Sequence, residues 1–132
     1  MITRVVGLLC FAFAICITTL AQTEPVLTSA GIPKYPALAL SVRVEGVVKL
    51  TFTLGSRSSE PTKVEVLSGH QLLKDAALEN VRTWRFENSY AAERTYETTF
   101  ECRISTGQKS AVCFESFHTV KIRAGEVPVI ED

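Results

Sequence analysis

The segment 35–86 constrains the fold of this chain most, because its hydrophobic period changes once within it. Residues 46–54 alternate apolar with polar side chains, which is the two-residue period of a strand with one face in the core. Residues 62–67 alternate in the same way after the turn-forming sequence Gly-Ser-Arg-Ser-Ser-Glu-Pro. The chain then takes up helical spacing and ends this segment with Trp84-Arg85-Phe86. A strand hairpin followed by an amphipathic helix is therefore predicted at the centre of the fold.

The predicted helix follows Ser68, which has the spacing of a capping box with Gln71. Its apolar residues recur at intervals of four and three positions, so they share one face. The aromatic residues at its end would seal this face onto the sheet. We expect a core that contains Phe52, Leu73, Ala77, Val81, Trp84 and Phe86.

Two further strands are predicted after the helix. The two-residue period returns in residues 94–104, and a turn at 106–109 leads to a final strand at 111–123. The alternation in that last strand is interrupted at Phe117 and His118, which predicts a bulge. A short helical turn is expected after Tyr35-Pro36. The fold class is therefore α+β: a small antiparallel sheet (β-β-α-β-β) with one helix packed across one face.

The N-terminal residues have the pattern of an export signal. Arg4 precedes an uncharged apolar run at 5–20, and the small residues Thr19 and Ala21 lie at the positions that a signal peptidase reads. The run is shorter than the roughly 20 residues that span a bilayer. We predict a signal peptide at 1–21, a lead-in at 22–34, a domain at 35–124 and a tail at 125–132, in a periplasmic or secreted protein. An uncleaved inner-membrane anchor is the alternative, and only that alternative brings the protein to a membrane.

Cleavage after Ala21 would leave two cysteines, Cys102 and Cys113. Pairing the last two predicted strands about the turn at 106–109 places them directly opposite one another, with Cβ atoms about 5 Å apart. An even number of cysteines in an exported chain favours a disulfide. We therefore predict a Cys102–Cys113 disulfide rather than a metal site completed by His118.

The sequence offers little chemistry for catalysis. A formal net charge of zero gives no basic field for nucleic acid. His70, between Ser68 and Asp75, is expected to be a turn residue at the start of the helix and not part of a triad. The residues Glu97 and Glu101 belong to a solvated strand face. The prediction is a protein that is not an enzyme and that uses no cofactor and no metal.

Several short motifs occur together in a fixed order along about half of the chain that would remain after cleavage. They are Tyr35-Pro36, Val44-Glu45-Gly46-Val47-Val48, Ser68-Gly69-His70, Leu73, Ala76-Ala77-Leu78 and Trp84-Arg85-Phe86. Their combination resembles the C-terminal domain of the TonB energy-transducer family. The resemblance implies a periplasmic domain that acts in energy-coupled transport. Such a domain binds the TonB box, a short peptide of an outer-membrane transporter, by adding it as a strand to a sheet edge.

The resemblance also implies a docking edge, because region 94–104 resembles the third strand of the family. The residues expected to bind the partner are Arg94, Tyr96, Thr98, Phe100 and Arg103. If the strand at 111–123 covers this edge, docking moves to the outer strand or to a dimer partner. The proline-rich spacer of family transducers is absent, and the residues after Phe86 match no family motif. The alternative function is an envelope-associated structural protein that self-associates through its sheet edges. Besides the transporter peptide, the alternative partners are another envelope protein and a second copy of the chain in a homodimer.

Overall fold

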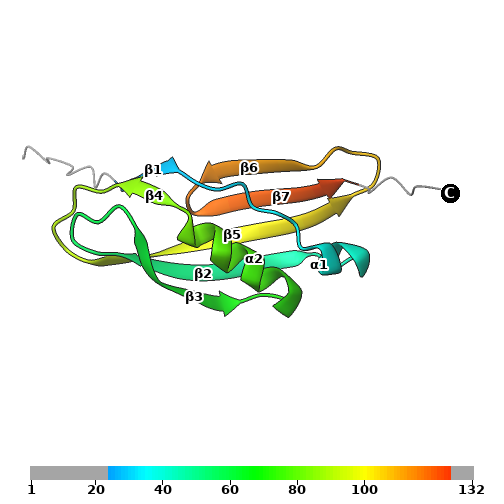
Figure 1. Cartoon of the computed structure of the whole chain (residues 1–132), viewed down its shortest axis with the longest axis horizontal. Coiled ribbons are helices and arrows are strands. Elements are labelled where there is room, and N and C mark those ends of the chain that lie inside the picture. The colour runs from blue at the N-terminus through cyan, green and yellow to red at the C-terminus, as the bar shows by residue number, and fades with distance from the viewer. Residues whose placement is uncertain (1–23, 126–132) are drawn as a thin grey trace, which may run out of the picture.

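The computed structural model describes residues 24–125, which form a five-stranded sheet, a two-stranded ribbon and two helices (Figure 1). In chain order the elements are β1 (Val26–Ser29), α1 (Ala37–Ser41), β2 (Gly46–Leu54), β3 (Pro61–Ser68), α2 (Gln71–Arg82), β4 (Arg85–Glu87), β5 (Arg94–Ser105), β6 (Ala111–Ser116) and β7 (Thr119–Gly125). The α+β class predicted from the sequence is confirmed. The predicted signal peptide and most of the predicted tail lie outside the described residues.

The large sheet has the strand order β3-β2-β5-β7-β6, and β1 pairs with β4 in the small ribbon. Strand β2 pairs antiparallel with both β3 and β5, whereas β5 and β7 run parallel. The sheet is therefore mixed, and the prediction of a purely antiparallel sheet is wrong. Figure 1 shows α2 over the half of the sheet that contains β2 and β3, while β7 and β6 extend beyond it.

The single final strand predicted at 111–123 is in fact two strands. The chain reverses at Phe117 and His118, where only a bulge was expected, and β7 returns between β5 and β6. The cause is Phe117, whose ring turns into the core and leaves only 6% of the residue exposed. It packs edge-on against Phe86 and Tyr96, with centroid distances of 5.5 and 5.6 Å. Burying this ring stabilises the chain more than extending a single strand through residues 117–118 would. The chain therefore turns back and forms the β6–β7 hairpin.

The core is an aromatic cluster centred on Trp84, which is fully buried. Its indole stacks on Phe100 at 6.0 Å and meets Phe52 edge-on at 5.8 Å. Such ring pairs add stability beyond the burial of their area. All six residues expected from the sequence to form the core are buried: Phe52, Leu73, Ala77, Val81, Trp84 and Phe86.

The start of α2 differs from the capping box expected at Ser68. Strand β3 continues through Ser68, and His70 is the N-cap residue. Its Nδ1 accepts a hydrogen bond of 3.0 Å from the backbone N–H of Leu72. This bond satisfies one of the free amides at the helix start, so His70 has a structural role in a turn, as expected.

The predicted Cys102–Cys113 disulfide is not formed, because both cysteines are free. Cys102 pairs with Ile122 of β7, and Cys113 pairs with Lys121 of the same strand. The two cysteines thus lie two strands apart, at a spacing of about 9–10 Å, which is too far for a disulfide. The prediction failed because it took β6 as the neighbour of β5.

The two thiols are expected to differ strongly in reactivity. Burial raises the pKa of the Cys102 thiol to about 11, so that only about 0.1% of it is thiolate at pH 8. Cys113 is exposed. Iodoacetamide at pH 8, followed by mass-spectrometric site mapping, should label Cys113 at least 100-fold faster than Cys102. The unfolded chain should label both at similar rates, and rapid labelling of native Cys102 would contradict its place in the core.

Candidate functional site

The two edges of the large sheet, β3 and β6, differ in their protection. Strand β3 begins with Pro61, carries Lys63 and Glu65, and has irregular pairing with β2. These features discourage pairing with another chain, and α2 packs beside this strand. Strand β6 has no proline, one register shift against β7 between Phe114 and Ser116, and one charged residue, Glu115, which forms an ion pair of 2.6 Å with Lys121. Strand β6 is therefore the less protected edge.

The hydrogen-bonding groups of β6 can be assigned to its two sides. The N–H of Thr99 in β5 donates to the carbonyl of His118 at 2.8 Å. This bond shows which residues of β7 turn their backbone groups toward β5 and which toward β6. Because backbone groups alternate along a strand, Lys121 turns its N–H and C=O toward β6. Cys113 is paired with Lys121 and faces it. Val112 and Phe114 therefore turn their backbone groups to the side where the described part of the chain provides no strand.

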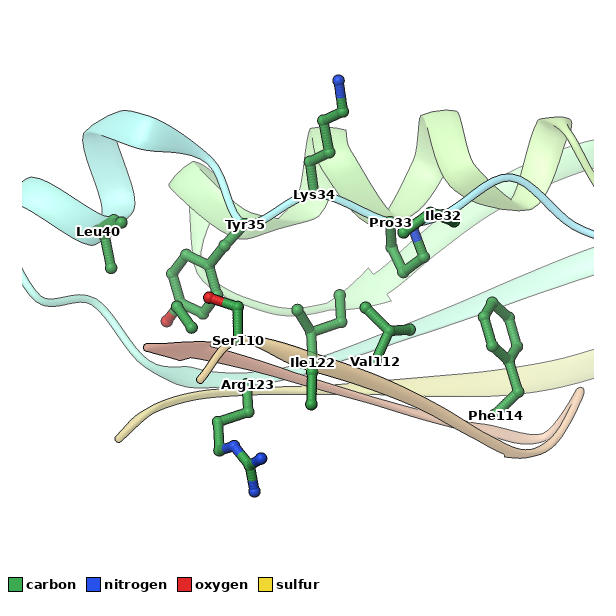
Figure 2. A pocket seen from close by; sticks show the side chains of 12 residues that line it. Ile32, Pro33, Lys34, Tyr35, Leu40, Ser110, Val112, Phe114, Ile122 and Arg123 are labelled. Carbon is green, nitrogen blue, oxygen red and sulfur yellow. The ribbon is translucent and has the colours of Figure 1, made fainter. Parts of the chain in front are cut away.

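An apolar groove lies beside this edge (Figure 2). Its floor is the inner face of the hairpin, from which Val112, Phe114 and Ile122 point toward the segment 32–35. That segment forms the roof, and Leu40 of α1 lines one end. The cavity volume is about 720 Å³, a size that accepts several side chains.

The roof is anchored to α2 at Gly31. Its N–H donates to Thr83 Oγ1 at 2.8 Å, and its carbonyl accepts from Asn80 Nδ2 at 2.7 Å. The other end of the Asn80 amide, Oδ1, accepts from Trp84 Nε1 at 2.9 Å. One buried asparagine thus connects the roof of the groove to the indole at the centre of the core.

The other end of the roof is anchored at Tyr35, whose hydroxyl donates to the carbonyl of Val44. Burial raises the pKa of Tyr35 to about 12, so the phenol keeps its proton at physiological pH and can donate this bond. With fixed points at Gly31 and Tyr35, the groove is preformed. A ligand would therefore lose little free energy in ordering it.

The charged residues that line the groove are both basic. Figure 2 shows Lys34 pointing outward from the roof and Arg123 pointing below the floor. Arg123 Nε donates to the carbonyl of Lys109 at 3.3 Å. No carboxylate lines the groove. The groove is thus apolar inside, with Lys34 at its rim and the Arg123 guanidinium on the opposite face of the sheet.

The docking residues expected from the sequence do not form an edge. Strand β5 pairs with β2 over residues 94–102 and with β7 over residues 99–105. Thr98 and Phe100 are fully buried, and the Arg94 guanidinium lies 4.0 Å from the centre of the Tyr90 ring. The prediction of a docking edge at Arg94, Tyr96, Thr98, Phe100 and Arg103 is therefore corrected: the C-terminal strands cover β5, the condition under which docking was expected to move outward.

The groove residues were missed by sequence reasoning. Residues 32–35 were taken as the end of a lead-in and the start of the domain, and Val112 and Phe114 as ordinary strand residues. The interrupted alternation after Phe114 was the available sequence signal. The 79% exposure of the apolar Ile32 is visible only in the structure. Within residues 24–125 no group of three His, Cys, Asp or Glu side chains could hold a metal, and no helix is long and apolar enough to cross a membrane.

A preformed apolar groove beside an open sheet edge defines a protein-interaction module. Residues 32–105 match the family described as Gram-negative bacterial TonB protein C-terminal, which covers more than half of the chain, and the protein belongs to this family. It is accordingly an interaction module of a family associated with the cell envelope, whose C-terminal domains interact with outer-membrane transporters. The comparison with curated proteins gives no match. The family match ends at Ser105, so the β6–β7 hairpin lies beyond it.

Proposed function

We propose that this protein binds an extended peptide of an outer-membrane transporter by strand addition to β6, in energy-coupled transport across the envelope. The observation that carries the proposal is the open side of β6, where the backbone groups of Val112 and Phe114 border the apolar groove. In strand addition, backbone hydrogen bonds supply affinity and pockets for alternate side chains supply selectivity. Because β7 occupies the side of β5 where the family resemblance places the guest, the outer strand takes over this role. The protein acts in the periplasm, exported by residues 1–21, and it is a binding module rather than an enzyme.

The groove favours a particular peptide chemistry. Alternate apolar side chains of a guest strand would pack on Val112 and Phe114 and below Ile32. An acidic residue next to this apolar run would face the ammonium group of Lys34 at the roof. We therefore expect peptides that combine a carboxylate with alternating β-branched residues to bind best.

Titration of the domain with TonB-box peptides of transporters, followed by amide NMR shifts, tests the proposal. We expect shifts at 112–114 and in the roof at 32–35. Val112→Asp should weaken binding at least tenfold, because it puts a carboxylate into the apolar floor. Leu67→Asp is the matched control: it places the same charge on the other edge strand, at a residue that is 55% exposed, and should bind as the wild type does.

Two outcomes would contradict this assignment. The first is the absence of shifts on any edge strand at millimolar peptide. The second is a set of shifts confined to β3 together with loss of binding in Leu67→Asp, which would place the peptide on the opposite edge.

A further inference from the structure

We infer that β6 is also a self-association surface, on which a second copy of this chain pairs its own β6 antiparallel, with Cys113 opposite Cys113 of the second copy. This inference uses the same edge as the proposed function but does not depend on peptide binding. Strand β6 lacks the proline of β3, carries one charge where β3 carries two, and has one register shift in its pairing where β3 has two. An open edge strand with few such features is a template for another strand.

The register follows from the direction of the backbone groups. Because Val112 and Phe114 face outward, a twofold axis can pass through residue 112, 113 or 114. An axis at 112 would set Phe114 against Ser110, and an axis at 114 would set Val112 against Ser116. An axis at Cys113 instead sets Val112 against Phe114 of the second copy, twice. The other two axes pair only Val112 with itself or only Phe114 with itself, so this register alone gives both residues an apolar partner.

The charges on the other face of the sheet agree with this register. Glu115 of the second copy would lie opposite Ala111, whose neighbour on β7 is Arg123. Each dimer would thus bring two carboxylates toward two guanidinium groups, and no like charges would face one another across the new pairing. The favourable arrangement arises from the same axis that matches the apolar residues.

The same axis brings two exposed thiols together. Cys113 turns its backbone groups inward to β7, so the Cys113 pair would be of the non-hydrogen-bonded kind, with Cα atoms about 4.5 Å apart. This separation is within the range that a disulfide spans. The thiol pair therefore provides a direct reporter of the register.

Oxidation of the full chain with diamide tests the inference. Two Cys113 thiols would form one S–S bond, and the diazene would take up the two electrons and two protons as it becomes a hydrazine. Mass spectrometry should find a Cys113–Cys113 link between two chains, formed within minutes at micromolar protein. Cys102→Ser should leave this link unchanged, because Cys102 is buried. Val112→Asp should slow its formation at least tenfold.

A pair of charge variants separates specific pairing from collision. Sedimentation of Cys113→Ser should show a reversible dimer without any covalent link. In that background, Ala111→Glu would face Glu115 of the second copy and weaken the dimer by about two- to tenfold, whereas Ala111→Lys would tighten it by a similar factor. Cys113→Ser that stays monomeric at hundreds of micromolar, or Ala111→Glu and Ala111→Lys with equal dimer affinities, would overturn the inference. Neither result would alter the peptide titration, so the two proposals fail separately.

Discussion

Replacing Trp84 by alanine is expected to lower the free energy of unfolding by about 3–5 kcal/mol, a large share of the roughly 5–15 kcal/mol typical of a domain. The indole is fully buried between helix and sheet and contacts the rings of Phe52, Phe86, Phe100 and Phe114. Its removal would leave a cavity that these rings cannot fill, because they extend from separate strands. Urea unfolding followed by far-UV circular dichroism measures the loss.

The indole nitrogen gives this substitution a second consequence. Trp84 Nε1 donates to Asn80, whose amide also holds Gly31 in the roof of the groove. Trp84→Phe keeps most of the apolar volume but removes the donor, and should cost about 1–3 kcal/mol. NMR shifts in 31–35 should then report a loosened roof in an otherwise folded domain. If Trp84→Ala lowers the free energy of unfolding by less than about 1 kcal/mol, the indole is not the centre of the core packing.

The part of the fold that local periodicity determines could be predicted from the sequence. The β2–β3 hairpin and α2 follow from a period of two that changes to the helical period, and from turn residues between them. The burial of Trp84 follows from its place at the end of the apolar stripe of α2. These features depend on residues that are close together in the chain, so they can be predicted from one sequence alone.

The C-terminal half required information that periodicity does not carry. Alternation in β5, β6 and β7 indicates strands, but it is the same for parallel and antiparallel pairing and says nothing about strand order. The insertion of β7 next to β5 depends on Phe117 finding space among rings contributed by β2, β4 and β5. For this one reason the disulfide was predicted between strands that are not neighbours, and β5 was expected to be an edge strand although β7 pairs with it.

The groove could not be predicted because its two walls are far apart in sequence. The roof at 32–35 and the floor at 112–122 meet because Asn80 and Thr83 fix Gly31 on α2 and Tyr35 is held by Val44. Polar residues on a helix that bind a loop about fifty positions away have no local signature. The site therefore appears only once the tertiary contacts are known.

Replacing Phe117 by alanine is expected to release the β6–β7 hairpin from the domain before the rest unfolds. The ring is the anchor of the hairpin: it lies at the reversal and packs on Phe52, Phe86 and Tyr96. Truncating a buried phenylalanine to alanine costs about 3–5 kcal/mol. Because the hairpin lies beyond the part of the chain that matches the family, its opening would expose the side of β5 that the family resemblance assigns to the guest peptide.

Amide hydrogen exchange can detect this opening residue by residue. Since Thr99 donates to His118, the amides of Thr99, Glu101 and Arg103 face β7, and the alternate amides of Thr98 and Phe100 face β2. In Phe117→Ala the first set should exchange about 100-fold faster while the second keeps its protection, a pattern that only local opening produces. Val112→Ala is the control on the same hairpin, since Val112 is 37% exposed and anchors nothing in the core, and it should leave both sets unchanged. Equal acceleration of both sets in Phe117→Ala would show instead that the hairpin and the domain unfold as one unit. In that case β7 could not detach from β5 while the rest of the sheet stays folded.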